Sequence, residues 1–230
     1  MDTFFSDKRV IVLAPHTDDG EFGCGGTIAR FVEAGSEVYY MAFSVCEQSV
    51  PYGFAKDELE NELKEAMKVL GLPAKNTLIY RYPVRRLQES RQEILQLMID
   101  ARSEIQPDIV FMPCLKDCHQ DHQTVSAEGL RAFKHSTIFS YEMPWNNLTL
   151  ETSSFVVLEE RHLQKKIDAL ACYKTQAFRP YADEEFLRGL GRVRGVQIGG
   201  HYAEAFELVR LVLGKSRVAV AGAQQVSQAA

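Results

Sequence analysis

Two short segments of the chain hold side chains that could bind a metal ion. Residues 15–21 read PHTDDGE and residues 114–122 read CLKDCHQDH, so the two segments contain several aspartates as well as His16, His119 and His122. A catalytic zinc typically takes three protein ligands and keeps a fourth position for water. One imidazole and one carboxylate from the first segment, with one imidazole from the second, would provide such a set.

The side chains left over match the other groups that hydrolysis needs. A bound divalent ion lowers the pKa of water from 15.7 to about 7, which provides a nucleophile near neutral pH. A neighbouring carboxylate could accept the proton of that water. A second histidine, oriented by a carboxylate, would stabilise the oxyanion or protonate the leaving group. The residue types alone leave open which of the adjacent Asp18 and Asp19 binds the metal.

Other interpretations of the same residues stay open at this point. The aspartate pair could cap the helix that follows it. Cys114, Cys118 and His119 could form a thiolate zinc site, although their spacing is not C-x-x-C. Two histidines and a carboxylate also suit non-haem iron, but nothing else here resembles a jelly-roll. The glycines within residues 23–26 are a weak signal for a dinucleotide loop and favour close helix–strand packing instead.

Alternating strand and helix patterns place both segments at one edge of a sheet. Residues 9–14 and 108–113 are short apolar runs, typical of strands buried on both faces. The rhythm predicts an α/β fold with a mostly parallel sheet and helices on both faces. In such sheets, ligands bind beyond the carboxyl ends of the strands, where both segments lie. The expected strands are residues 9–14, 37–43, 76–80, 108–113, 137–141 and 154–158, and the expected helices are residues 26–34, 57–70, 89–105, 122–133 and 160–173.

The pattern weakens toward the end of the chain. Residues 188–200 (RGLGRVRGVQIGG) are rich in glycine and arginine and predict a loop. Residues 202–213 fit a helix and a strand equally well. Residues 215–230 are small and polar, which predicts a frayed tail. No linker separates a second domain, so we expect one domain over residues 1–214.

The composition excludes several classes of protein. The chain is 46% hydrophobic and 25% charged, which is ordinary for a globular protein. Its formal net charge of -5 gives no reason to expect a nucleic-acid partner. The opening residues, MDTFFSDKRV, lack a signal peptide's apolar core, and no apolar run reaches the about 18 residues of a membrane span. The five irregularly spaced cysteines then indicate reduced thiols in a cytoplasmic protein.

At the metal-binding segments the sequence resembles the PIG-L/LmbE-like N-acetylglucosaminyl deacetylase family. That family carries A-H-P-D-D-x-E followed by G-x-G-G-T, and residues 14–27 here read APHTDDGEFGCGGT. Its D-x-H-x-D-H signature matches DCHQDH at residues 117–122, after the strand PDIVFMP. A late R-G-x-x-I-G-x-x-Y-A-E-A-F pattern matches residues 194–206. The first two motifs, in this order and at this separation, are highly specific.

The resemblance implies a three-layer, Rossmann-like fold and a divalent metal, usually Zn2+, that activates water. The reaction would remove the N-acetyl group from a small-molecule amino sugar or sugar conjugate and release acetate. Position by position, the resemblance implies these roles: metal ligands His16, Asp19 and His122; general base Asp18; a group that polarises the carbonyl or acts as acid, His119; and the carboxylate partner of that histidine, Asp121.

Departures from the family pattern leave the substrate undetermined. Thr17 stands where the family commonly has proline, and residues 57–60 (DELE) lack an arginine that often contacts substrate in the family. Hydrolysis of another amide or ester, and metal binding without catalysis, are the alternative functions. An assembly of identical chains is compatible with the sequence. The candidates for contact with a sugar are Arg192, Arg194, His201, Tyr202 and, as a stacking wall, Trp145.

Overall fold

The first strand of the sheet, β1 (Arg9–Ala14), is buried on both faces in the computed structural model. Val10 and Val12 belong to one hydrophobic core, whereas Ile11 and Leu13 belong to a second core on the opposite face. Successive side chains of a strand point to opposite faces. An uninterrupted apolar run is therefore what a strand covered by helices on both sides requires.

The structure describes residues 4–214, in which seven strands form one sheet. The strands are β1 (Arg9–Ala14), β2 (Glu37–Ala42), β3 (Thr77–Ile79), β4 (Ile109–Pro113), β5 (Thr137–Tyr141), β6 (Ser154–Leu158) and β7 (Tyr202–Arg210). Their order across the sheet is β3-β2-β1-β4-β5-β7-β6. Strands β3, β2, β1, β4 and β5 run parallel to one another, and β7 runs antiparallel to both β5 and β6.

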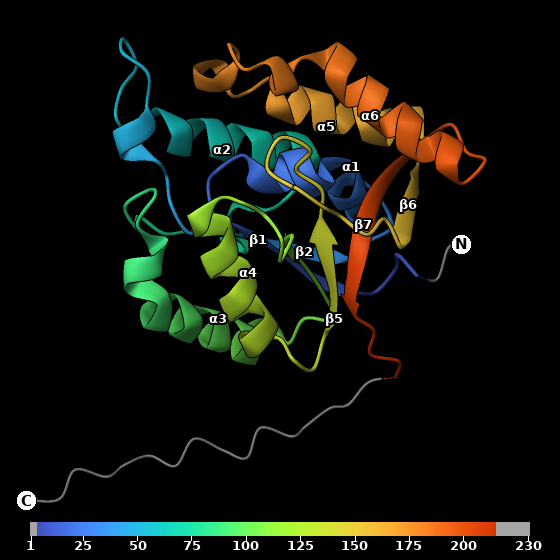
Figure 1. Ribbon diagram of the computed structural model, residues 1–230, viewed down its shortest axis with the longest axis horizontal. Coiled ribbons are helices and arrows are strands. Elements are labelled where there is room, and N and C mark those ends of the chain that lie inside the picture. The colour runs from blue at the N-terminus through green and yellow to red at the C-terminus, as the bar shows by residue number, and fades with distance from the viewer. Residues whose placement is uncertain (1–3, 215–230) are drawn as a thin grey trace, which may run out of the picture.

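Helices cover both faces of the sheet. The α-helices are α1 (Asp19–Glu33), α2 (Glu58–Leu70), α3 (Arg91–Ile105), α4 (Gln120–Ala132), α5 (Glu160–Leu170) and α6 (Glu184–Gln197). Helices α1, α2, α5 and α6 pack together on one face, and α3 packs with α4 on the other (Figure 1). This arrangement confirms the predicted three-layer α/β fold. It also confirms that α1 and α4, which follow β1 and β4, begin at the same edge of the sheet.

Helix α6 is the largest difference from the sequence prediction, because it contains most of the predicted loop at residues 188–200. Asp183 caps the helix by accepting a backbone N–H of its first turn at 2.6 Å. Gly195 then lets the helix approach the chain that enters β7. A Cβ at this position would lie 2.3 Å from the carbonyl oxygen of His201. The glycine that indicated a loop is therefore a packing residue inside a helix.

Two further boundaries differ from, or complete, the prediction. Helix α1 begins at Asp19 rather than at residue 26, and its backbone is interrupted at Cys24, where φ is -149°. Residues 202–213, for which the sequence did not decide, form β7 over most of their length. The predicted tail at residues 215–230 lies outside the described residues.

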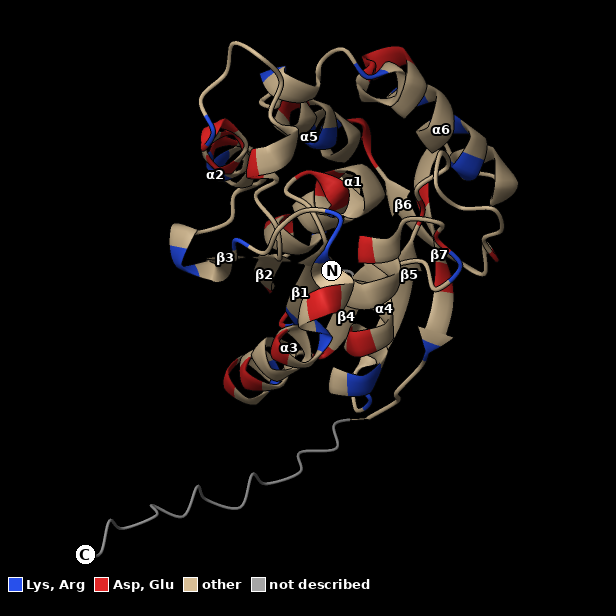
Figure 2. Ribbon diagram, turned by 60° about the vertical axis from the view of Figure 1, so that its left-hand side comes forward, with Lys and Arg blue, Asp and Glu red and all other residues tan. Residues whose placement is uncertain are grey.

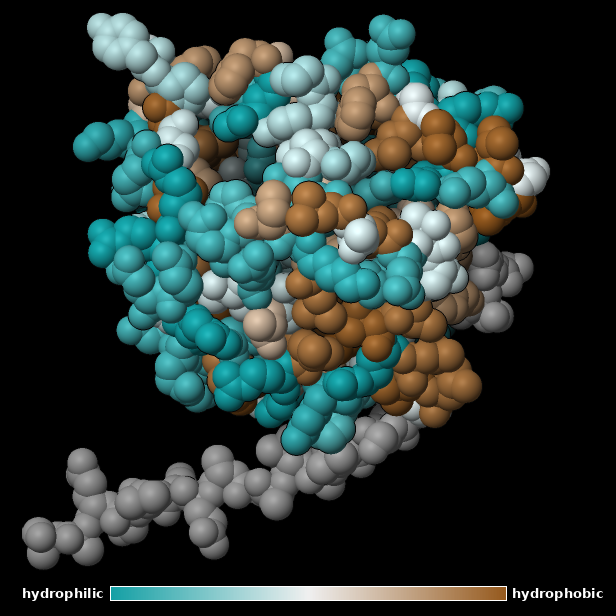
Figure 3. Space-filling view, in the orientation of Figure 1, coloured by the Kyte–Doolittle hydropathy of each residue, from teal (hydrophilic) through white to brown (hydrophobic). Residues whose placement is uncertain are grey.

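The surface of the described part is mixed in character. Figure 2 shows basic and acidic residues interspersed over the helices. Figure 3 shows hydrophobic residues gathered beside the end of the described chain, where Leu211 and Leu213 are 54% and 84% exposed. Within residues 4–214, no helix combines the length and apolarity needed to cross a membrane.

Candidate metal centre

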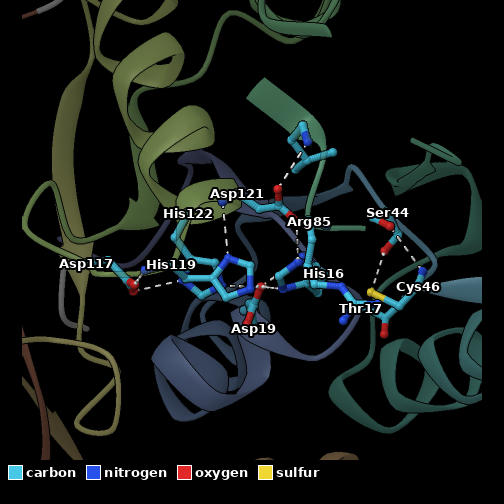
Figure 4. Close-up of polar contacts among 12 residues, drawn as sticks. His16, Thr17, Asp19, Ser44, Cys46, Arg85, Asp117, His119, Asp121 and His122 are labelled. Atoms are coloured by element: carbon cyan, nitrogen blue, oxygen red, sulfur yellow. Dashed lines mark hydrogen bonds and ion pairs between the residues drawn. The ribbon is translucent and has the colours of Figure 1, made fainter. Parts of the chain in front are cut away.

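The two predicted metal-binding segments meet where β1 and β4 end. His16 follows β1, whereas His119 and His122 lie at the start of α4 (Figure 4). One ring nitrogen from each of these histidines lies within 4.8 Å of the corresponding atoms of the other two. Their ring centroids are 4.9 to 5.3 Å apart. Residues about one hundred positions apart in the sequence are thus adjacent in space, as the parallel sheet predicted.

Asp19 lies between two of the three imidazoles. Its Oδ2 is 3.1 Å from Nδ1 of His16 and 3.2 Å from Nε2 of His122. The backbone N–H of His16 also donates to this oxygen at 2.8 Å. Burial alone would raise the pKa of Asp19, but the two neighbouring histidines hold it well below its ordinary value. Asp19 is therefore ionised, and one oxygen atom faces two ring nitrogens.

Each of these two imidazoles has a second buried carboxylate on its other nitrogen. Asp121 Oδ2 lies 3.0 Å from Nε2 of His16, and Asp117 Oδ2 lies 2.8 Å from Nδ1 of His122. Burial favours the neutral rings, yet the carboxylates raise the pKa of His16 to about 9 and that of His122 to about 10. Metal-binding histidines commonly donate their second N–H to a carboxylate, which fixes the ring orientation. Both rings have this arrangement.

The structure pairs Asp121 with His16 and not, as the family resemblance implied, with His119. The Asp121 carboxylate also accepts the backbone N–H groups of Arg85 at 2.5 Å and Leu87 at 3.1 Å. Arg85 has a φ of +67°, a backbone conformation that residues other than glycine rarely adopt. The loop after β3 thus turns its N–H groups toward Asp121. These two donors and His16 contact the Asp121 carboxylate, so it is not the partner of His119.

His119 is oriented by backbone and not by a carboxylate. Its Nδ1 accepts the backbone N–H of Asp121 at 3.1 Å as the N-cap of α4. A ring nitrogen that accepts this bond carries no proton, so the neutral ring holds its proton on Nε2. Burial and the neighbouring His16 and His122 lower the pKa of His119 below its ordinary value. His119 is thus a neutral ring with an N–H available to donate.

Asp18 differs from Asp19, Asp117 and Asp121 because, among the described residues, its carboxylate forms no ion pair with a histidine. It occupies the N-cap position of α1, but its side chain makes no capping hydrogen bond. This observation removes the interpretation of Asp18 as a helix cap. Burial, together with the charge of Asp19, raises its pKa to about 6. A carboxylate with a pKa near neutrality is suited to accept a proton and to return it.

Buried hydroxyl groups fix the backbone of the first segment. The hydroxyls of Tyr40 and Tyr173 contact the carbonyl oxygen of Thr17 at 2.9 and 2.8 Å. Both hydroxyls also contact the Glu21 carboxyl group, with Tyr173 at 2.6 Å. Burial raises the pKa of Glu21 to about 8, so this group is protonated below that pH. Thr17 is thus held through its carbonyl oxygen, which does not depend on the proline that the family pattern has here.

Sequence reasoning gave no role to several of these supporting residues. Asp117 opens the second motif and Glu21 closes the first, so their motif positions were the available signal. Nothing in the sequence pointed to Tyr40 or Tyr173, because their contacts with Thr17 come from β2 and from the chain after α5.

The candidates for substrate contact are less closely connected to the centre. In the described part of the chain, the histidines and aspartates of the metal centre have no hydrogen bond or ion pair with any of four candidates: Arg192, Arg194, His201 and Tyr202. Arg192 donates to the His201 carbonyl oxygen at 3.0 Å, and Arg194 pairs with Glu142, its Nε lying 2.9 Å from Oε2. Trp145 is half-buried, and one face of its ring is stacked on Tyr181 with centroids 3.9 Å apart.

The thiolate zinc site receives no support. The Cys114 Sγ lies 3.8 Å from the Thr149 carbonyl oxygen and 3.7 Å from a Glu207 carboxylate oxygen. Cys118 is exposed. In the described part of the chain, the group that could hold a metal consists of histidines and not of thiols.

Comparison with known proteins agrees with the sequence motifs and the fold. A family model described as PIG-L: GlcNAc-PI de-N-acetylase matches residues 11–133, which is more than half of the chain. The chain therefore belongs to the PIG-L family.

Three similar proteins extend over most of the chain. The diacetylchitobiose deacetylase of Thermococcus kodakarensis is 26% identical and covers 89% of this chain and 85% of its own length. The probable N-acetyl-alpha-D-glucosaminyl L-malate deacetylase 2 of Bacillus anthracis is 25% identical, covering 74% of this chain and 82% of its own length. The crystal structure of the conserved protein TT1542 from Thermus thermophilus superposes with a TM-score of 0.77 at 26% identity, covering 90% of this chain and 97% of that one.

Proposed function

We propose that this protein is a zinc-dependent N-deacetylase that acts on an N-acetylated amino sugar or sugar conjugate. The observation that carries the proposal is the position of Asp19 between two imidazoles that are each backed by a buried carboxylate. Asp18 and His119 lie beside this set, and in the described part of the chain neither forms a histidine–carboxylate pair. The deacetylase names of two similar proteins support the same reaction and the same substrate class.

The donor set fits a zinc ion. Two ligand atoms of a tetrahedral zinc, each bound at 2.0 to 2.1 Å, lie about 3.3 Å apart. Nδ1 of His16 and Nε2 of His122 lie 3.1 and 3.2 Å from Asp19 Oδ2, close to that separation. His16, Asp19 and His122 would hold the ion and leave a fourth position open. When bound, zinc would act as a Lewis acid and lower the pKa of water to about 7. Another divalent metal would suit the same ligands.

The remaining side chains supply the proton transfers of amide hydrolysis. Asp18 would accept a proton from the attacking water as the new carbon–oxygen bond forms. The Nε2–H of His119 would donate to the acetyl oxygen as negative charge develops on it. The proton would then pass from Asp18 or His119 to the amine nitrogen as the carbon–nitrogen bond breaks. The products are acetate and a free amine.

Two alternatives make different demands on the same site. A protein that only binds metal needs the three ligands but neither a base nor a hydrogen-bond donor. The half-buried Asp18, with its raised pKa, and the neutral His119 therefore favour catalysis. Hydrolysis of another amide or an ester would use every residue named above. Only a comparison of substrates separates that reaction from sugar deacetylation.

The test is acetate release with matched metal-free and zinc-loaded protein. The substrates are N,N′-diacetylchitobiose, simple N-acetylglucosamine glycosides, an N-acetylated amino acid and an acetate ester. We expect acetate from an N-acetylated sugar, falling to background after chelation and returning when zinc is added. Release from the ester or the amino acid alone would replace the proposed substrate class. Absence of release from every substrate by zinc-loaded protein would overturn the proposal.

A further inference from the structure

The chain between α5 and α6 packs directly against the first metal-binding segment. The hydroxyl of Tyr173 donates to the carbonyl oxygen of Thr17 at 2.8 Å. Eight residues further on, the ring of Tyr181 meets the ring of Phe22 edge-on, with centroids 5.4 Å apart. Thr17 precedes Asp18, and Phe22 lies in the first turns of α1. In the sequence, Arg179 lies between these two points of contact with the first metal-binding segment.

The Arg179 side chain is held in one position by its own segment. Its Nε donates to Oε1 of Gln176 at 2.9 Å. The guanidinium carbon lies 5.1 Å from the ring centroid of Phe178 and 5.7 Å from that of Tyr181. Tyr181 is itself fixed by the stack with Trp145. A guanidinium that rests on aromatic rings and is tied through one N–H loses little freedom when it binds an anion.

The charge of Arg179 is not balanced by a carboxylate of its own. In the part of the chain that the structure describes, Arg179 has no carboxylate oxygen within 4.0 Å. Its charge reaches Asp18, where it acts to lower the pKa against burial and the charge of Asp19. By contrast, many arginines of this chain form ion pairs with glutamates. These are Arg81, Arg86, Arg91, Arg131, Arg161, Arg188 and Arg194.

We propose that Arg179 binds an acidic group, a carboxylate or a phosphate, on the substrate whose N-acetyl group is cleaved beside Asp18. This inference rests on the proposed function and narrows its substrate class to acidic conjugates of an N-acetylated amino sugar. The guanidinium offers several N–H groups in a plane, which matches the oxygens of both kinds of anion. Arg179 would be a specificity-determining residue that positions the substrate and takes no part in proton transfer.

The test compares acidic and neutral conjugates of the same sugar. The substrates are N-acetylglucosamine 1-phosphate, N-acetylglucosaminyl L-malate and methyl N-acetylglucosaminide, each with zinc-loaded protein. We expect kcat/KM for at least one acidic substrate to exceed that of the neutral one by roughly 10- to 100-fold, the usual effect of a hydrogen bond to a charged group. The phosphate and malate arms tell which anion is preferred.

Variants separate a specific contact from a general effect of charge. Arg179→Gln is expected to bring the ratio of acidic to neutral kcat/KM close to one, mainly through KM for the acidic substrate. Arg179→Lys keeps the charge without the planar fork and should retain part of the ratio. Lys174→Gln removes an exposed positive charge from the same segment and should keep the wild-type ratio. Thermal unfolding of each variant confirms that it is folded.

Four outcomes would overturn the inference. If Arg179→Gln keeps the wild-type ratio, Arg179 does not bind the acidic group. If it lowers kcat/KM equally for all three substrates, Arg179 acts through Asp18 and not on the substrate. If the wild type cleaves all three substrates equally well, the proposed deacetylase function survives and only the acidic specificity fails. Release of acetate from none of them would instead remove the proposed function together with this inference.

Discussion

Replacing Asp117 with asparagine tests whether the carboxylate behind His122 sets the affinity for metal. Asp117 is 1% exposed. Its Oδ2 lies 2.8 Å from Nδ1 of His122, and its Oδ1 accepts the backbone N–H of His119 at 2.8 Å. Asparagine has the same shape but only one oxygen, so its NH2 group would face one of these two donors. The substitution therefore removes one hydrogen bond and the negative charge without opening a cavity.

The size of the effect follows from that loss. Removing the partner of a metal-binding histidine typically weakens metal binding by about 10- to 100-fold. This range corresponds to about 1.4 to 2.8 kcal/mol. A buried donor left without an acceptor costs about 1 to 3 kcal/mol, which is the same range. We therefore expect zinc to bind at least about 10-fold more weakly to Asp117→Asn than to the wild type.

Competition with a chromophoric zinc chelator at fixed pH measures this affinity directly. Asp168→Asn is the matched control, because Asp168 is exposed on α5 and the chemical change is the same. The control should bind zinc as the wild type does. Circular dichroism melting of the metal-free proteins checks that both variants fold. Zinc affinity of Asp117→Asn within about twofold of wild type would refute the role of the carboxylate.

Two further predictions concern stability. The pKa of Glu21 rises from its ordinary 4.5 to about 8 on folding, so the folded state holds this proton more tightly. Stability of the metal-free protein should fall as pH rises through that window, by up to about 1.4 kcal/mol per pH unit, and urea unfolding of Glu21→Gln should lack this component. Equal slopes for both proteins would contradict the assignment. Gly195→Ala should lower the melting temperature, because the new Cβ would lie 2.3 Å from the backbone oxygen of His201. Gly189→Ala is the control and should leave the melting temperature unchanged, because its Cβ would meet no atom within 4 Å. Equal melting temperatures of the two variants would count against the packing role of Gly195.

Most of the sheet could be predicted from the sequence because its strands are buried on both faces. The predicted strand at residues 9–14 contains a continuous apolar run and not an alternation of apolar and polar residues, and its boundaries match β1. Residues 137–141 and 154–158 likewise match β5 and β6. Helix α6 could not be predicted in the same way. Gly195 lowers helix propensity locally, and its reason for being there is a contact with His201, which lies in the following loop.

The meeting of the two metal-binding segments could be predicted, whereas the pairing of their side chains could not. Parallel strands end at one edge, so His16 and His122 had to lie near each other once β1 and β4 were neighbours. The partner of Asp121 depends on a third segment, the loop at Arg85, whose backbone N–H groups take up the carboxylate. No spacing within the D-x-H-x-D-H motif contains that information.

The division of labour between Asp18 and Asp19 is the central claim, and one paired measurement on Asp18→Asn tests it most directly. Zinc content and acetate release are measured on the same preparation. A base that is not a ligand predicts zinc content equal to that of wild type, with acetate release lowered by about 100-fold or more. A variant that loses its zinc, or that keeps both its zinc and the wild-type rate of acetate release, would contradict this assignment.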